Sequence, residues 1–409
     1  MDVMHARCAG LDVHKKTVVA CVRIAVAGSV HYEVRTFATT TPGLQALATW
    51  LRAAGCTHAV LESTGVYWKP VWAVLAEDVT LVLAHAAAVR NLPGRKSDVQ
   101  DARWLADVLA HGLVRASFVP PPEQQALREL TRTRKQLVRE VTAHTQRIHK
   151  VLEGANVKLA SVLSDVLGVS GCALIEGLAA GETDPERLAD RVHPRVRGKR
   201  AAIVEVLVGG RLQPHHRLLL QQHLQVITSL EASIAALDTE IAARLDPFRE
   251  AVDRLVTHPG VSETVAAVIL AELGPDMTRF PTAGHARSWV GLCPRLDESA
   301  GKHRSRRIRK GSPWLKPVLI QSAWAAIRVP NSYHRALYGR LVRRSGKKQA
   351  IVAVAAALLT AIYYMLTTDQ PYHELGPHHL TETDRHRMAQ RLTKRLQHLG
   401  YDVTLHQAA

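Results

Sequence analysis

The chain has 409 residues, of which 47% are hydrophobic and 22% charged, the balance of a globular protein with room for two or three domains. Its formal net charge of +17 and isoelectric point near 10.0 indicate an anionic partner, either nucleic acid or a membrane surface. Five scattered cysteines without a CxxC pair argue against a zinc ribbon and against a secreted disulfide framework. The first residues, MDVMHARCAG, do not predict a signal peptide, because no apolar segment follows a basic start.

One stretch, Ala350–Leu366, is apolar enough to suggest a membrane segment. It is short for a span and contains Thr360 and two tyrosines, so a buried helix is favoured. We therefore expect no membrane association and a cytoplasmic protein whose anionic partner is nucleic acid.

The first 119 residues alternate between strand and helix patterns, which predicts an α/β layer. β-Branched and apolar residues predict strands within Ala9–Ile24, where Asp12 precedes the β-branched residues, and at Val30–Phe37, His58–Glu62 and Val79–Ala84. Apolar residues at helical spacing predict helices over Leu44–Ala54 and Val66–Ala76 and a third helix that begins at Ser97, a good N-cap residue.

Four acids stand at the edges of these predicted elements: Asp12 and Glu62 in strands, Asp98 and Asp101 in the first turn of the third helix. A lone acid in an apolar strand is costly to bury unless a cation compensates its charge. Carboxylates gathered from strand ends and a helix start suit Mg²⁺, which takes oxygen ligands and supports phosphoryl transfer. For Asp98 or Asp101 alone, simple complementation of the helix dipole is favoured.

After Pro120-Pro121-Pro122 the strand patterns end. A four-three alternation predicts a long coiled-coil-like helix over Glu123–Gly154, and a second long helix is predicted over Leu218–Leu245. The two suggest an antiparallel hairpin that packs on itself or against another protomer. The basic residues of the first long helix form either a nucleic-acid path or a solvated face: Arg128, Arg132, Arg134, Lys135, Arg139, Arg147 and Lys150.

Beyond Pro247, Leu255–Leu273 predicts two helices joined by a Pro-Gly turn, which is either a phosphate-gripping hairpin or a plain core turn. Apolar helices are predicted over Trp314–Val329 and Lys347–Leu366. The remaining residues are polar and rich in histidine, without metal-ligand spacing. These changes of pattern predict four regions, 1–119, 120–247, 248–366 and 367–409.

The densest charge follows Ser299-Ala300-Gly301. Clustered cations hold and neutralise phosphates, and a glycine turn lets the backbone come close to them. A hydroxyl in this position therefore suits phosphodiester chemistry, although a basic loop that only grips nucleic acid is favoured on this stretch alone. The expected nucleic-acid-binding residues are Lys302, Arg304, Arg306, Arg307, Arg309 and Lys310.

Several segments resemble the DEDD family of insertion-sequence transposases, whose N-terminal domain is similar to the RuvC Holliday-junction resolvase and to RNase H. GLDVHKK, LESTGVYW and KSDVQDARWLA resemble its three acidic motifs. HPGVSETVAAVILAELG and GLCPRLDESAGKHRSRRIRKGSPWL resemble its C-terminal transposase domain. The resemblance covers nearly the whole chain up to about Leu375.

This resemblance implies an α/β RuvC-like domain (1–119), a helical dimerisation region (120–247), a mainly α-helical transposase domain with a nucleophilic serine (248–366) and a polar tail (367–409). It implies a recombinase that cleaves, exchanges and rejoins DNA strands through a serine–DNA intermediate. An element-encoded structured RNA would pair with donor and target DNA. The family's Mg²⁺-binding tetrad maps onto Asp12, Glu62, Asp98 and Asp101.

The family's nucleophilic serine maps onto Ser299, with Ser305 and Ser312 as the fallback positions. A serine hydroxyl needs activation, and a metal held by the first domain can provide it. The four-three seam of the long helices predicts a dimer that assembles into a tetramer on DNA. The resemblance also places the protein in the bacterial cytoplasm, at the nucleoid.

Two other functions remain open from the sequence. One is a metal-dependent junction-resolving nuclease in which Ser299 is only structural, and covalent trapping on DNA distinguishes it from a transposase. The other is a non-enzymatic nucleic-acid-binding protein, which binds with strong salt dependence and cuts nothing.

Overall fold

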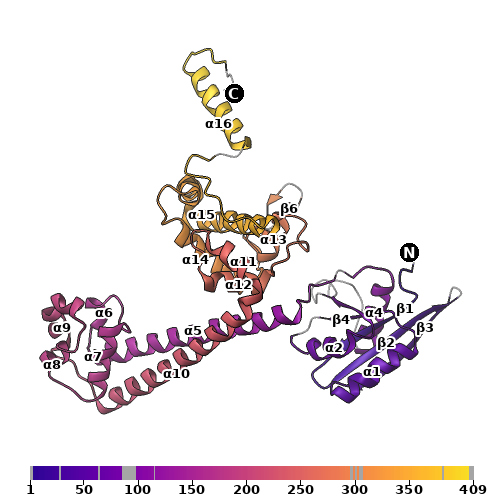
Figure 1. Ribbon diagram of the computed structural model, residues 1–409, viewed down its shortest axis with the longest axis horizontal. Helices are drawn as coiled ribbons and strands as arrows, with labels where there is room; N and C mark the ends of the chain where they lie inside the picture. The colour runs from indigo at the N-terminus through magenta and orange to yellow at the C-terminus, as the bar shows by residue number, and fades with distance from the viewer. Residues whose placement is uncertain are drawn as a thin grey trace. The chain divides into compact units, whose positions relative to one another are not determined.

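The computed structural model describes residues 3–26, 29–62, 65–84, 98–114, 116–294, 298–299, 302–303, 307–379 and 382–404. For residues 298–299, 302–303 and 382–387 this description covers the backbone alone. The chain forms two compact units, Met1–Pro120 and Pro121–Ala409. Figure 1 labels the elements of both units.

The first unit is built on a mixed five-stranded sheet with the strand order β3-β2-β1-β4-β5. β1 pairs with β2, and β2 with β3, in antiparallel fashion, whereas β1–β4 and β4–β5 are parallel. This is the α/β, RNase H-like fold that the sequence predicts. The strands are β1 (Arg7–Val13), β2 (Thr17–Val26), β3 (Ser29–Ala38), β4 (His58–Glu62) and β5 (Thr80–Ala84).

The stretch predicted to hold one strand forms two, β1 and β2, and Asp12 lies inside β1 rather than before a strand. The turn between them is polar, and His14 N donates to Thr17 O at 2.9 Å. A period-2 pattern does not identify β1, because both strands are almost wholly buried and carry apolar residues on both faces.

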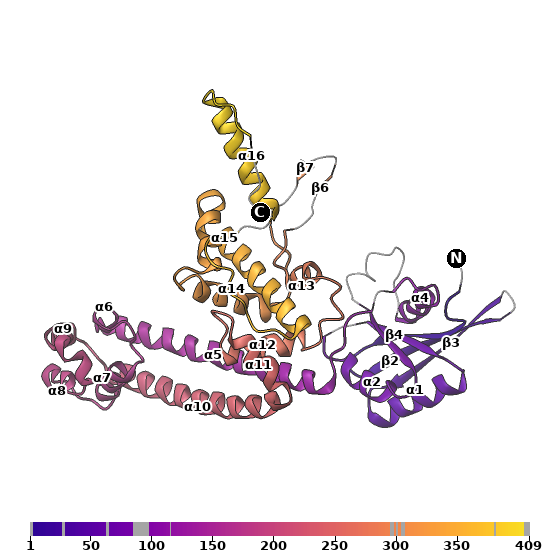
Figure 2. The ribbon, with the colours of Figure 1, turned by 45° about the horizontal axis from the view of Figure 1, so that its top comes forward.

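Helices cover both faces of this sheet (Figure 2). α1 (Thr41–Ala53) and α2 (Trp68–Leu75) bury leucines against Leu11 and its neighbours on one face. α4 (Asp98–Ala110) packs on the opposite face, against Cys8 and Val60. The start predicted for α4 at Ser97 lies outside the described residues.

The second unit contains the two long helices, α5 (Pro122–Gly154) and α10 (Pro214–Leu245), which run side by side and antiparallel (Figure 2). Arg134 pairs with Asp238, and His144 with His223. Residues later in α5 therefore contact residues earlier in α10, as antiparallel helices do. The hairpin therefore packs on itself within one chain, and its contact with another protomer stays a prediction. Small helices fill the chain between them: α6 (Leu159–Val162), α7 (Val169–Ala179), α8 (Pro185–Ala189), η1 (Pro194–Lys199) and α9 (Arg200–Leu207).

A second helical core gathers around the start of α5 and the end of α10. Its elements are η2 (Asp246–Phe248), α11 (Arg249–Val256), α12 (Glu263–Leu273), α13 (Ala283–Val290), α14 (Leu315–Ala326) and α15 (Tyr333–Thr368). The strands β6 (Glu298–Ser299) and β7 (Lys302–His303) lie between α13 and α14 in the chain. α15 begins earlier than predicted, and α16 (Glu382–His398) forms in the tail, where no helix was predicted. The boundaries proposed at residues 247 and 366 stay predictions.

α15 is long and apolar enough to cross a membrane by length and composition. However, its apolar second half packs inside the protein, where Val354, Leu358 and Ile362 are fully buried. It is therefore a core helix, as expected for Ala350–Leu366.

Candidate active site

Asp12 and Glu62 occupy equivalent positions on two adjacent strands. β1 and β4 are parallel, with Leu11 opposite Leu61, and Asp12 and Glu62 are the next residues of each strand. Side chains alternate along a strand, so Asp12 faces the same side as Gly10, and Glu62 the same side as Val60. Both acids thus lie on the face of the sheet that α4 covers.

Gly10 lets α4 approach this face closely. A Cβ at Gly10 would lie 2.0 Å from the carbonyl oxygen of Ala102 and 2.5 Å from the amide nitrogen of Ala106. Only a residue without a side chain fits there. This contact sets the first turn of α4, which carries Asp98 and Asp101, beside the end of β1.

A polar clamp also fixes α4 over the antiparallel part of the sheet. Arg23 of β2 is buried, and its Nε donates to Asp107 Oδ1 at 2.9 Å. The hydroxyl of Tyr32 donates to the same oxygen at 2.6 Å, and the guanidinium of Arg103 lies 3.8 Å from the Tyr32 ring centroid. These charge-assisted bonds hold the helix that presents the acids.

Three side chains meet at the end of β1. His14 Nε2 lies 3.2 Å from Asp12 Oδ2 and 3.3 Å from Asp98 Oδ2. One ligand atom from each of Asp12, His14 and Asp98 lies within 4.8 Å of the others. Glu62 and Asp101, both half-buried, belong to the same face but not to this three-residue group.

The electrostatics of the group favour a bound cation. The Asp12 side chain is only 16% exposed, and burial raises the pKa of its carboxyl above the usual value. His14 opposes this shift, whereas the carboxylates of Asp98 and Asp101 add to it. The Asp98 side chain is 62% exposed, so desolvation concerns Asp12, whose charged form a neighbouring positive charge stabilises. The donor set, oxygens with one imidazole nitrogen, therefore fits a divalent metal.

His14 is the site residue that sequence reasoning missed. It lies in the GLDVHKK motif, two residues after Asp12, but a single histidine in a polar turn gives no metal-ligand spacing. The antiparallel turn between β1 and β2 folds its ring back toward Asp12, and only the tertiary position of α4 adds Asp98.

The predicted nucleophile belongs to a short two-stranded arm, described by β6, β7 and the bridge between Pro294 and Ile308. Ser299 in β6 is paired with Lys302 in β7. Pro294 and Ile308 form a bridge at the base of the arm, and Arg309 N donates to Cys293 O at 3.4 Å. The side chains of Ser299 and Lys302, and residues Arg304, Ser305 and Arg306, lie outside the described part of the chain.

The chain that leaves this arm is anchored to the end of α13. Gly311 has φ of 57°, and a Cβ there would lie 2.0 Å from Val290 O, so only glycine fits. Arg309 Nη1 donates to Ser288 Oγ at 3.2 Å, and Lys316 Nζ donates to Arg309 O at 2.8 Å. The described cations Arg307, Arg309 and Lys310 are nevertheless exposed as residues.

Ser312, one of the fallback nucleophiles, is a helix cap. It is buried, and its Oγ accepts hydrogen bonds from Trp314 N at 3.3 Å and Leu315 N at 3.1 Å. These bonds satisfy amides at the start of α14, which gives the hydroxyl a structural role.

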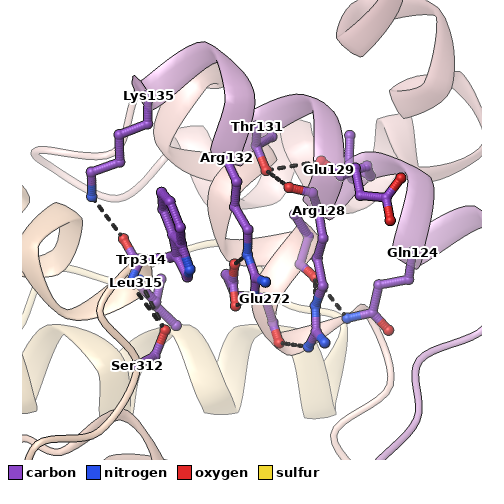
Figure 3. A network of polar contacts seen from close by, with 12 residues as sticks. Gln124, Arg128, Glu129, Thr131, Arg132, Lys135, Glu272, Ser312, Trp314 and Leu315 are labelled. Atoms are coloured by element: carbon purple, nitrogen blue, oxygen red, sulfur yellow. Dashed lines mark hydrogen bonds and ion pairs between the residues drawn. The ribbon is translucent and has the colours of Figure 1, made fainter. Parts of the chain in front are cut away.

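α5 is fastened to α12 and to the residue before α14 (Figure 3). Arg128 donates to the carbonyls of Ala271 and Glu272, which satisfies oxygens at the end of α12. Arg132 forms a bidentate pair with the buried carboxylate of Glu272, at 2.7 and 2.9 Å. Lys135 Nζ donates to Trp314 O at 3.1 Å.

These contacts assign four of the seven basic residues on α5. Arg128, Arg132, Arg134 and Lys135 bind the protein itself, so these four form neither a solvated face nor an open nucleic-acid path. Arg139, Arg147 and Lys150 are exposed, and for them both interpretations stay predictions. The Pro-Gly turn before α12 is half-buried and packs closely on α14, because a Cβ at Gly260 would lie 2.3 Å from Ser322 O. This supports the plain core turn.

Two family models match the chain. One, for DEDD transposases of IS110 elements and described as a transposase, matches residues 9–157 and so includes the four acids. The other, described as Transposase IS116/IS110/IS902 family, matches residues 252–339, which include Ser299 and the basic run.

Curated relatives cover most of the same chain. It is 27% identical over 312 residues to a probable family 20 transposase of Pseudomonas aeruginosa, spanning 75% of this chain and 79% of the relative. It is 24% identical over 330 residues to the putative transposase y4pF/y4sB of Sinorhizobium fredii, spanning 79% and 74%. It is 24% identical over 281 residues to the transposase for insertion sequence element IS1111A of Coxiella burnetii, spanning 68% of each.

Proposed function

Because this chain belongs to the IS110 family of transposases, which are enzymes that act on DNA, we propose that it moves an insertion sequence by cleaving, exchanging and rejoining DNA strands through a serine–DNA intermediate. The observation that carries the proposal is the convergence of Asp12 and Asp98 at one strand end. The basic run beside Ser299 supports it from the second unit.

The DEDD domain of the family implies a divalent metal, and we propose that it is Mg²⁺. Asp12, Glu62, Asp98 and Asp101 would hold it, because Asp12 and Glu62 lie on the sheet face that α4 covers, and Asp98 and Asp101 lie in the first turn of α4. All four supply the oxygens that Mg²⁺ prefers. His14 keeps Asp12 and Asp98 together through its Nε2. When bound, the metal supplies positive charge for phosphoryl transfer.

We propose that the Ser299 hydroxyl attacks a DNA phosphorus atom. A bond forms between Oγ and phosphorus, the bond from phosphorus to one deoxyribose oxygen breaks, and the proton lost by Oγ is balanced by one gained at the leaving oxygen. The cations that follow Ser299 offset charge on the phosphoryl oxygens, which is usually a large catalytic contribution. Attack by the other DNA end on this phosphoserine reverses the step and reseals the strand without a nucleotide cofactor.

Ser299→Ala tests this step. The variant should keep the fold, because losing one hydroxyl of a two-residue strand costs about 1 kcal/mol or less. It should bind DNA but form no covalent adduct on a suicide DNA substrate, as seen by denaturing electrophoresis and mass spectrometry. An adduct on Ser305 would move the nucleophile. Cleavage by the wild type without any adduct would instead support the metal-dependent junction nuclease.

We further propose that an element-encoded structured RNA guides the protein to donor and target DNA, in the bacterial cytoplasm at the nucleoid. The net charge of +17 suits two nucleic-acid partners. Sequencing of RNA that co-purifies with the protein from its native host tests this. A discrete transcript from next to the gene is expected, whereas a random sample of cellular RNA would contradict guidance.

A further inference from the structure

A second cluster of cations lies far from the serine arm in sequence, on α15. Between Glu298 and Asp369 the chain contains fourteen lysines and arginines and no aspartate or glutamate. Five of these cations fall within nine residues of α15: Arg340, Arg343, Arg344, Lys347 and Lys348. All five are exposed, and no ion pair is found for them among the described residues.

The first three of these cations occupy one face of a helix. Arg340, Arg343 and Arg344 are spaced i, i+3 and i+4, so their side chains are neighbours and repel one another. The half-buried Tyr338 and Val342 belong to the inner side of the same helical stretch. A solvated helix face normally alternates acids with bases, and this face contains bases alone.

The remaining two cations stand where α15 begins again after a break. Gly346 has φ of 74° and ψ of 166°, a conformation almost restricted to glycine, and it interrupts the helix. Lys347 and Lys348 therefore lie in the first turn of the second half. Cations there oppose the helix dipole, and an anion placed at this turn removes the repulsion.

We propose that Arg340, Arg343, Arg344, Lys347 and Lys348 form a second nucleic-acid contact, which binds the phosphate backbone of DNA or RNA without reading bases. Arg340 and Arg344 lie about 6 Å apart along the helix axis, and Lys347 and Lys348 follow directly after the break at Gly346, so the five cations can contact more than one phosphate of a duplex. The proposal rests on the family's action on DNA but not on the chemistry proposed for Ser299 or for the metal. It assigns binding affinity, and no catalytic role, to this part of α15.

The test compares neutral and charge-preserving variants of the full chain. Arg340→Gln/Arg343→Gln/Arg344→Gln and Lys347→Gln/Lys348→Gln remove charge, whereas Arg340→Lys/Arg343→Lys/Arg344→Lys keeps it. Arg195→Gln/Arg197→Gln is the matched control, because it removes two exposed cations of η1. Affinity is measured for a short duplex DNA, for a structured RNA and for vesicles of phosphatidylserine and phosphatidylcholine, over about 50 to 200 mM salt.

For duplex DNA, removing each cation that neutralises a phosphate should make the slope of log K against log salt shallower by about 0.9. The glutamine variants should bind DNA, RNA or both at least tenfold more weakly, and the two probes decide which nucleic acid binds there. The lysine variant and the control should bind as the wild type does, and melting temperatures should not change. Unchanged slopes in both glutamine variants, an equal weakening in the control, or a weakening confined to vesicles would overturn the proposal.

Discussion

At the scale of single residues, Asp12 combines an unfavourable charge with a favourable ligand position. Without metal, desolvation and the neighbouring carboxylates of Asp98 and Asp101 disfavour the charged form of its half-buried side chain. We expect Asp12→Asn to melt no lower than the wild type in a chelator, and to lose the rise in melting temperature that Mg²⁺ gives the wild type. That rise corresponds to about 2.7 kcal/mol at a hundredfold excess over Kd.

Scanning calorimetry with and without Mg²⁺ measures both effects. Glu33→Gln is the matched control, because it removes an exposed carboxylate of β3 that pairs with Arg35 outside the metal centre. The control should keep the full Mg²⁺-induced rise in melting temperature. If Asp12→Asn also shows the full rise, Asp12 is not a metal ligand.

A buried histidine pair makes the second unit sensitive to acid. The Nε2 atoms of His258 and His334 are 3.1 Å apart, and His258 Nδ1 lies 2.8 Å from Pro259 O, to which it can donate. Burial, with a further contribution from His334, lowers the pKa of His258 from 6.5 to about 4. Burial also lowers the pKa of His334. The carboxylate of Glu374 faces this pair and opposes both shifts.

The unfolded chain therefore binds protons at a higher pH than the folded unit does. Stability contributed by neutral His258 is complete above about pH 6.5 and is lost as the pH falls toward about 4, at about 1.4 kcal/mol per pH unit. We expect the melting temperature of the second unit to fall between pH 7 and pH 5. His258→Asn should weaken this dependence of melting temperature on pH, and His215→Asn, at an exposed histidine, should not. If the wild type and both variants show the same pH dependence, the buried histidine pair is not its cause.

At the scale of elements, the metal centre depends on how closely α4 approaches β1. Gly10→Ala would place a Cβ 2.0 Å from Ala102 O, so α4 must shift outward. We expect a loss of about 1–3 kcal/mol in stability and a reduced Mg²⁺-induced rise in melting temperature, because Asp98 moves away from Asp12.

The control for this prediction is Gly154→Ala at the end of α5, where a Cβ would meet nothing within 4 Å. It should change stability by less than about 1 kcal/mol and leave the response to Mg²⁺ intact. If Gly10→Ala keeps both its stability and its Mg²⁺ response, the close approach is not what builds the centre.

At the scale of the whole molecule, the middle of the α5–α10 hairpin has apolar residues that stay partly exposed. Its ends are buried in two cores, through Leu127 and Leu245 at one end and Ile148 and Leu220 at the other. Between them Leu137 and Val141 are only half-buried, and Val138 is 40% exposed. Two antiparallel helices leave such residues available to a second copy of the chain.

We therefore keep the proposal of a dimer that assembles into a tetramer on DNA. Val138→Asp should shift the protein toward a monomer, because a carboxylate in an apolar interface is costly to desolvate. Light scattering at micromolar concentration measures this. Val169→Asp on α7, where the valine is 77% exposed, is the control and should stay dimeric. A monomeric wild type, alone and on DNA, would reject the proposal.

The sequence by itself determined the α/β pattern of the first unit, the place of the four acids at element ends and the long helical hairpin, but not the break between β1 and β2 or the helix α16. These follow from local period and composition, which act within a few residues. It also determined the resemblance to transposases, since motifs in both halves occur in family order.

Only the tertiary structure decided which of these groups meet. His14 joins Asp12 and Asp98 because a turn folds the chain back and because Gly10 lets α4 approach the sheet closely. Neither effect can be read from the spacing of residues in the sequence. Likewise, Arg128 and Arg132 read as a basic helix face, but α12 offers them a helix end and the buried Glu272. A charged side chain takes the partner that the fold brings within a few ångströms, and residues 140 positions apart become neighbours only when the chain has packed.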